Sequence, residues 1–113
     1  MENHKLVLRE HLNHYGFLFG GYLLMWVDEV AWIAGSLDFP ECQFVTVAMD
    51  RVEFKKRVPE GTILTLRTRQ SRLGNTSVSY EVSALNEAKI EIFSTTVTLV
   101  RIDEAGEKRP IEA

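Results

Sequence analysis

The segment at residues 20–37, GGYLLMWVDEVAWIAGSL, constrains the fold of this chain most, because it is apolar on nearly every side. Its only charges are the adjacent Asp28 and Glu29. A helix without a polar face must be covered over most of its surface, so we expect a buried helix that ends before Pro40. A carboxylate inside such a helix is costly unless it is paired, hydrogen-bonded or used in chemistry.

After this helix the apolar residues alternate with polar ones, which is typical of β-strands. We expect long strands at residues 43–56, 62–73, 77–85 and 90–102, joined by short turns, and a brief first strand at residues 5–9. Tight turns between successive strands make a sheet antiparallel. The chain is therefore predicted to be one α+β domain, a curled antiparallel sheet of about five strands around one long helix. Residues 103–113 are expected to be a loose charged tail.

Size and composition exclude several classes of function. The net charge of −3 gives no general attraction to nucleic acid or to an anionic membrane. The apolar run is shorter than the ~20 residues that span a bilayer, and it carries adjacent carboxylates. The amino-terminal MENHKLVLREH lacks the apolar core of a secretory signal, and the lone Cys42 suits a reducing compartment, so we expect a cytoplasmic protein. A single sheet leaves one flank of the helix bare, which predicts a homo-oligomer.

Asp28 is the first candidate for chemistry. Gly21, Asp28 and Gly35 lie on one narrow stripe of the helix, because a spacing of seven residues is about two turns. A carboxylate between glycines can sit at the floor of a shallow groove that a ligand or another helix approaches closely. The residue types fit a general base or nucleophile and, equally well, a structural carboxylate that is hydrogen-bonded or paired across an interface. Glu29 lies on another side of the helix and is expected to be structural.

The loop before the helix offers a second set of polar groups. Asn13 could orient a ligand with its amide, although on pattern alone it is more often an ordinary turn residue. No Ser, Thr or Asp caps the helix at Gly20 and Gly21, so the first backbone N–H groups are free to polarise a carbonyl or stabilise an oxyanion.

The remaining candidates are weaker. The three histidines and Cys42 match no zinc spacing, so we expect no metal site. Basic residues gather at positions 51–57 and 67–72, where a few of them could bind a small anion such as a nucleotide phosphate. Such residues are more often a solvated strand face.

The loop and the helix together carry a recognisable pattern. The sequence N-x-x-G-x-x-F-G-G at residues 13–21, followed by L-x-W-x-D-E at residues 24–29, resembles the acyl-CoA thioesterases of the hotdog fold. The likeness continues through residues 45–54, V-x-x-G at 58–61, LGNTS at 73–77 and the last strand. The chain departs from the family pattern at His11, where an acidic residue is usual, and at Asn75, where an arginine or lysine is common.

The resemblance implies a hotdog fold and a hydrolase that cleaves acyl-CoA to a free acid and CoA, with no separate cofactor. It implies a homodimer whose sheets join edge to edge, assembled further into a homohexamer or a homotetramer. Asp28 of one subunit would be the general base or nucleophile, and Asn13 of the other would orient the thioester or the water. Backbone N–H groups at Gly20 and Gly21 would polarise the thioester carbonyl.

The same resemblance places the substrate. CoA would lie along the turn formed by Gly74, Asn75, Thr76 and Ser77. The acyl chain would run in a tunnel lined by Leu24, Met25 and Trp32. Two other functions fit the sequence: a hotdog module that binds acyl-CoA without catalysis, and a thioesterase of the aryl-CoA type.

Overall fold

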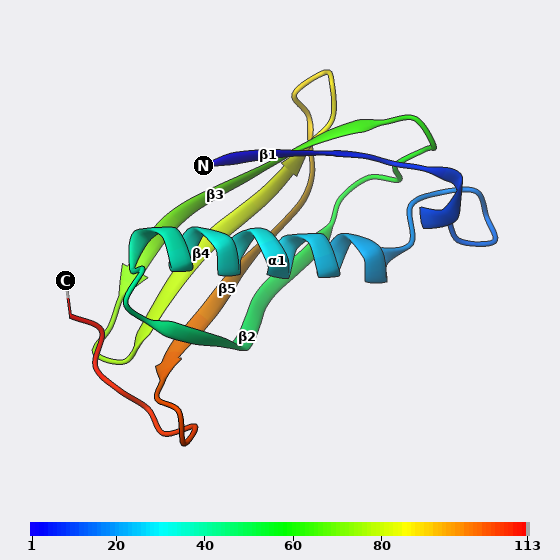
Figure 1. Cartoon of the computed structure of the whole chain (residues 1–113). Helices are drawn as coiled ribbons and strands as arrows, with labels where there is room; N and C mark the ends of the chain where they lie inside the picture. Colours follow the sequence, from blue (N-terminus) through cyan, green and yellow to red (C-terminus); the bar gives the residue numbers. More distant parts are fainter. Residues whose placement is uncertain (113) are drawn as a thin grey trace.

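The computed structural model describes residues 1–112, and one long helix lies across one face of an antiparallel sheet (Figure 1). The helix α1 spans Gly20–Asp38 and follows a short 3-10 turn at Arg9–His11. The strands are β1 (Glu2–Leu6), β2 (Gln43–Phe54), β3 (Ile63–Leu73), β4 (Ser77–Leu85) and β5 (Glu91–Ile102). They form one five-stranded sheet in the order β1-β3-β4-β5-β2. The predicted combination of a single long helix with a five-stranded antiparallel sheet is confirmed.

The core lies between α1 and the concave side of the sheet. The helix contributes Leu23, Trp26, Val27, Val30, Ala31 and Ala34 as buried residues, and β3, β4 and β5 contribute alternate apolar side chains. Gly35 lets the helix approach the sheet, because a Cβ atom there would lie 2.6 Å from Cδ1 of Leu99. The stripe of Gly21, Asp28 and Gly35 is therefore not one open groove: Gly35 is buried, Asp28 is half-buried and Gly21 is exposed.

The carboxyl end of α1 is held to β4 by a buried tyrosine. The hydroxyl of Tyr80 donates a hydrogen bond to Oδ2 of Asp38 at 2.7 Å. Burial, followed by this bond to a carboxylate, raises the pKa of Tyr80 well above its ordinary value. Tyr80 therefore stays a neutral donor, and it gives Asp38 a partner at a helix end that disfavours negative charge.

Strand β2 forms one edge of the sheet and is irregular. It pairs with β5 alone, and its register shifts between Thr46 and Ala48 and again between Asp50 and Glu53. At the second bulge Arg51 has a φ of 53°. Thr95 donates its hydroxyl to the Asp50 carbonyl at 2.7 Å, which satisfies a backbone group in this bulge. The uniform alternation expected for this segment is therefore interrupted, because each bulge shifts the inward and outward sides by one residue.

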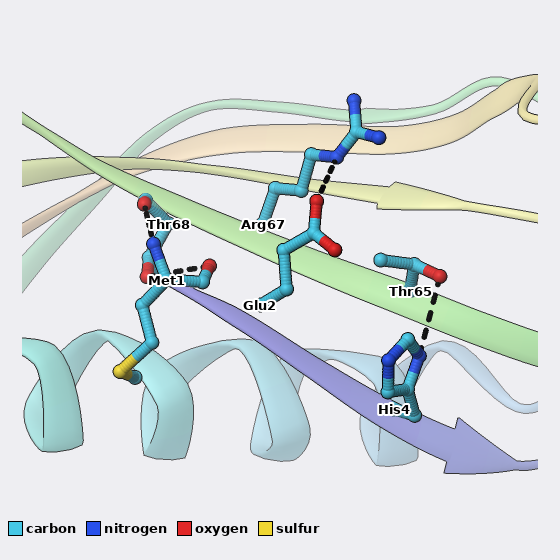
Figure 2. Close-up of polar contacts among 6 residues, drawn as sticks. All are labelled: Met1, Glu2, His4, Thr65, Arg67 and Thr68. Atoms are coloured by element: carbon cyan, nitrogen blue, oxygen red, sulfur yellow. Dashed lines mark hydrogen bonds and ion pairs between the residues drawn. The ribbon is translucent and has the colours of Figure 1, made fainter.

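Strand β1 lies nearer the amino terminus than residues 5–9, where we expected it. Its polar side chains have partners on β3 (Figure 2): Nε of Arg67 donates to Glu2 at 2.7 Å, and His4 lies 3.3 Å from Thr65. The Met1 amino group donates to the Thr68 carbonyl at 3.0 Å. These cross-strand partners explain why a polar segment forms a strand, which its own pattern does not indicate.

The described part of the tail, residues 103–112, differs from the loose segment that we expected. Its chain folds back beside β5: the Arg109 N–H donates to the Arg101 carbonyl at 3.0 Å, and Ile111 joins the buried core. Asp103 accepts N–H groups of Glu107 and Ala105, both at 2.9 Å, and these bonds, with Arg109 nearby, lower the pKa of its carboxyl. A single apolar residue among charges anchors the segment, which composition alone did not indicate.

No helix in the described part of the chain is long and apolar enough to cross a membrane.

Candidate active site

Asp28 points from α1 toward the edge strand β2. Its Oδ1 accepts a hydrogen bond of 2.6 Å from the hydroxyl of Thr46. The carboxylate is half-buried, and none of the ion pairs among residues 1–112 involves it. A donor that orients one carboxylate oxygen leaves the other oxygen free to accept a proton, which is the arrangement that a general base needs.

Asn13 has the turn role that its pattern favoured, and its role toward a ligand stays a prediction. Its Oδ1 accepts the N–H groups of Tyr15 at 2.9 Å and Phe17 at 3.2 Å, so the side-chain carbonyl is committed to the turn. The amide nitrogen remains as a donor, and Asn13 lines a cavity at the start of the helix. A ligand can therefore meet Asn13 only as a hydrogen-bond donor.

The amino end of α1 is uncapped, as the sequence predicted. Phe19 occupies the cap position without a side-chain hydrogen bond. The first helical N–H groups that bond to the Phe19 carbonyl belong to Tyr22, at 3.1 Å, and Leu23, at 3.4 Å. Within the described residues the N–H groups of Gly20 and Gly21 have no acceptor. They are donors at the positive end of the helix dipole.

The two glycines also have a packing reason. A Cβ atom on Gly20 would lie 3.2 Å from the Phe54 ring, and one on Gly21 would lie 2.7 Å from the Phe19 ring. Aromatic side chains therefore approach the helix start closely, as its two glycines allow. Of these residues, Gly20 and Phe54 line the cavity described below.

His11 holds this end of the helix in place. Its Nδ1 accepts the Leu8 N–H at 2.9 Å, and its backbone carbonyl accepts the Phe19 N–H at 2.8 Å. Its ring packs edge-on against Tyr22 and Trp26, at centroid distances of 5.0 and 4.9 Å. The histidine that departs from the family pattern is therefore a structural residue between the 3-10 turn and α1.

The cavity has a volume of about 560 Å³ and lies between the Asn13 loop, the start of α1 and the end of β2. Its lining residues are Asn13, Tyr15, Phe17, Leu18, Gly20, Leu23, Phe54, Lys55, Lys56, Arg57 and Val58. Asp28 and Thr46 are not among them. One chain thus brings Asn13 and Gly20 together and, separately, joins Asp28 to Thr46.

The predicted CoA turn connects β3 to β4. The Gly74 N–H donates to the Ser77 carbonyl at 2.8 Å, which closes the turn. The carbonyls of Asn75 and Thr76 accept N–H groups from the carboxyl-terminal part of the chain, Ile111 at 2.8 Å and Arg101 at 2.9 Å. The backbone carbonyls at the centre of this turn are therefore occupied by Arg101 of β5 and Ile111 of the tail, while the side chain of Asn75 is exposed.

The predicted acyl-tunnel residues lie along the outer part of α1. Leu24 is half-buried, whereas Met25 is 55% exposed and Trp32 is 45% exposed. The Trp32 indole donates to the Phe44 carbonyl at 3.1 Å, so it is fixed against β2. Met25 and Trp32 thus form an exposed apolar surface beside Asp28, which another subunit or an acyl chain could cover.

Sequence reasoning missed Thr46 as the partner of Asp28. A signal was present: strand alternation places Thr46 on the same side as the buried Phe44, two residues earlier. A hydroxyl on the helix-facing side of the strand can donate a hydrogen bond to a half-buried carboxylate of the neighbouring helix. Within residues 1–112, no group of three or more His, Cys, Asp and Glu side chains could hold a metal ion.

The helix lying against a curled five-stranded antiparallel sheet is the hotdog fold. A hexameric hotdog-fold thioesterase of Campylobacter jejuni has a TM-score of 0.87 and 31% identity, covering 97% of this chain and 88% of that one. A hexameric thioesterase from Yersinia pestis has a TM-score of 0.91 at 23% identity, a likeness of fold that covers 98% and 93% of the two chains.

The family model described as the thioesterase superfamily matches residues 15–92, so the chain belongs to that superfamily. An uncharacterised acyl-CoA thioester hydrolase of Zymomonas mobilis is 30% identical over 112 residues, covering 95% of this chain and 73% of that protein. Mouse acyl-coenzyme A thioesterase 11 is 30% identical over 83 residues, which are 74% of this chain but 14% of the mouse protein. The chain thus spans only a small part of that relative.

A solved relative with its ligand is the acyl-CoA hydrolase of Staphylococcus aureus in complex with butyryl-CoA, CoA and CoA disulfide. Its TM-score is 0.88 at 26% identity, and the match covers 98% of this chain and 68% of that chain.

Proposed function

We propose that this protein hydrolyses acyl-CoA thioesters to a carboxylic acid and CoA. The observation that carries the proposal is the division of polar groups between two places. The cavity beside Asn13 and Gly20 offers N–H donors for a carbonyl oxygen but no carboxylate. The oriented carboxylate of Asp28 lies apart from it, beside the free edge of β2. Two copies of the chain would complete one site.

The proposed dimer joins the free edges of two β2 strands around a twofold axis. Val45 and Val47, which are 40% and 55% exposed on this edge, would then be covered together with Met25 and Trp32. Such isologous pairing extends the sheet across both subunits. It would present Asp28 of one protomer to the cavity of its partner. The Campylobacter jejuni relative is hexameric, which supports three such dimers in one assembly over the tetrameric alternative.

The residues suggest a sequence of chemical events. The Gly20 and Gly21 N–H groups, with the amide of Asn13, would hold the thioester oxygen and stabilise it as it becomes an oxyanion. Asp28 would take a proton from a water molecule as that water attacks the carbonyl carbon. The C–S bond then breaks, the CoA sulfur leaves as a thiolate and receives a proton, and the acid is released. Direct attack by Asp28, through an anhydride that water then cleaves, is the alternative course.

Relatives support the choice of residues. The Staphylococcus aureus hydrolase has been solved with alanine in place of a threonine. It has also been solved with alanine in place of an asparagine and of an aspartate. That asparagine and that aspartate are separated by the same number of residues as Asn13 and Asp28. The three residue types are those that the present chain offers in Asn13, Asp28 and Thr46.

The decisive experiment replaces the proposed base. Asp28→Asn keeps the acceptor for Thr46 but cannot take up a proton, so kcat should fall by roughly 10²–10⁴-fold on straight-chain acyl-CoA substrates. Release of CoA is followed with a thiol reagent. Glu29→Gln is the matched control, because it removes the neighbouring, exposed carboxylate. Its activity should stay close to that of the unchanged protein.

Two results would point to the other functions. Binding of CoA esters without hydrolysis of any of them would identify a non-catalytic acyl-CoA-binding module, with Asp28 as a structural residue. A preference for phenylacetyl-CoA over straight-chain esters would identify the aryl-CoA type. Unchanged turnover by Asp28→Asn would remove Asp28 from the mechanism.

A further inference from the structure

The cavity at the start of α1 carries an unbalanced charge. Lys55, Lys56 and Arg57 line it, and no aspartate or glutamate is among its lining residues. The chain as a whole has a net charge of −3, so this concentration of positive charge is local. Cations gathered in a concave site with apolar walls attract an anion more strongly than the same cations on a flat surface.

The three cations are not equivalent. Lys55 forms an ion pair with Glu91, and this hydrogen bond raises the pKa of Lys55. Among the described residues neither Lys56 nor Arg57 forms an ion pair. The Arg57 guanidinium lies 5.3 Å from the centroid of the Phe17 ring, which holds it beside the Asn13 loop. Lys56 and Arg57 therefore remain available to an anionic ligand.

The residues that line the cavity fall into three chemical groups. Asn13 and Gly20 supply the N–H donors, whereas Lys56 and Arg57 follow the end of β2. Leu18, Leu23 and Phe54 are apolar members of the same lining. A ligand that satisfies all three groups has a carbonyl oxygen, a short apolar stretch and an anionic end. A volume of about 560 Å³ is suited to a small organic group.

We propose that the preferred substrates are CoA thioesters of short dicarboxylic acids, whose far carboxylate binds Lys56 and Arg57. This inference rests on the proposed thioesterase function, since it assumes that the thioester carbonyl lies at Gly20. The carbonyl donors and the cations line one small cavity. The long pantetheine arm, by contrast, separates the CoA phosphates from the thioester. The anion that fits here is therefore on the acyl group.

The test compares succinyl-CoA with butyryl-CoA, which have acyl chains of the same length and differ in a terminal carboxylate or methyl group. For the unchanged protein we expect kcat/KM to be about 10-fold higher for succinyl-CoA than for butyryl-CoA, because one charge-assisted hydrogen bond contributes a factor of about this size. Lys56→Met should remove about that factor for succinyl-CoA and leave butyryl-CoA within about 2-fold. Lys89→Met, which removes an exposed lysine outside the cavity, is the control and should change neither value.

Each other outcome has a definite meaning. An equal rise in KM for both esters in Lys56→Met would assign the cations to the CoA phosphates and overturn the inference. Equal rates for both esters in the unchanged protein, unaffected by Lys56→Met, would overturn it while leaving thioester hydrolysis intact. If neither ester is cleaved, calorimetric binding of the two esters decides the inference, and the proposed function is judged separately on longer straight-chain and aryl esters. Equal affinities would then contradict the inference, and tighter binding of succinyl-CoA that Lys56→Met abolishes would support it.

Discussion

At the scale of single residues, the environment of Asp28 is set by the hydrogen bond that it accepts from a hydroxyl. A carboxylate in an apolar helix needs a partner, and the partner here is the neutral Thr46 rather than a cation. The hydrogen bond from this neutral donor orients the carboxylate without pairing its charge. Asp28 is thereby held in one direction while it keeps an oxygen free.

Replacing Thr46 tests whether this orientation matters. Thr46→Val keeps the shape of the side chain and removes the hydroxyl, so we expect kcat to fall by roughly 10-fold with little change in KM. Thr46→Ser should restore most of the rate, because it returns the donor. Steady-state kinetics on one acyl-CoA would measure both. An equal loss in the serine variant would indicate that Thr46 acts through packing alone.

At the scale of elements, the helix and the sheet are fitted to each other at Gly35. Tyr80, Phe44 and Leu99 all lie within 3.6 Å of the position that a Cβ atom on Gly35 would take. This contact fixes the height of α1 above β5, and with it the height of Asp28 relative to β2. The glycine thus belongs to the packing that positions the site.

Gly35→Ala should therefore destabilise the protein despite the higher helix propensity of alanine. Propensity favours alanine by about 1 kcal/mol, whereas overpacking costs about 1–3 kcal/mol. We expect a net decrease in the free energy of unfolding, measured by urea denaturation. Gly35→Ala combined with Leu99→Val should recover part of the loss, because it shortens the side chain in contact. Equal stability of the alanine variant would mean that the sheet yields at this point.

The elements were largely readable from the sequence because their periods are clear. The continuous apolar run predicted α1, and alternation predicted β3, β4 and β5 to within one residue of their observed bounds. The errors arose where a partner far along the chain decides the local structure. Glu2 and His4 become strand residues through Arg67 and Thr65, and Ile111 is held by the β3–β4 turn. A pattern read locally contains neither partner.

The candidate site was predictable as residue types but not as an arrangement. Asn13, Gly20 and Asp28 were identified from the helix, its uncapped start and the loop before it. Their separation into a cavity and a distant carboxylate depends on how the Asn13 loop packs against residues 54–58. The pairing of Asp28 with Thr46 depends on the register of β2 beside the helix. Neither arrangement follows from spacing in the sequence.

At the scale of the whole molecule, a single chain leaves two features uncovered: the free edge of β2 and the exposed apolar residues of α1 beside Asp28. Met25 and Trp32 lie on α1, and Val45 and Val47 lie on the neighbouring strand. Edge strands with exposed apolar residues readily pair with another chain unless something covers them. A second copy that pairs along β2, as we propose, would cover this edge and would bring a carboxylate to the cavity.

If the site is divided between two subunits, two inactive variants with different defects can restore activity when they form a mixed dimer. Asp28→Asn spoils only the carboxylate half. Asn13→Asp keeps the oxygen that Tyr15 and Phe17 require and replaces the amide donor with a negatively charged oxygen, which cannot donate to the thioester. In a mixed dimer of the two variants, one site collects both defects and the other collects none. Equal amounts refolded together should therefore regain about a quarter of the normal activity, whereas each variant refolded alone stays inactive.

The same measurement made on mixtures that were never unfolded serves as the control, because intact oligomers exchange no chains at first. Activity that rises only after joint refolding would establish that neither copy carries a complete set of catalytic groups. A mixture no more active than its components would place Asn13 and Asp28 of one chain in the same site. If each chain carries a complete site, two chains with different defects cannot restore activity to each other. If the site is divided between chains, two different defective chains can complement each other in one dimer.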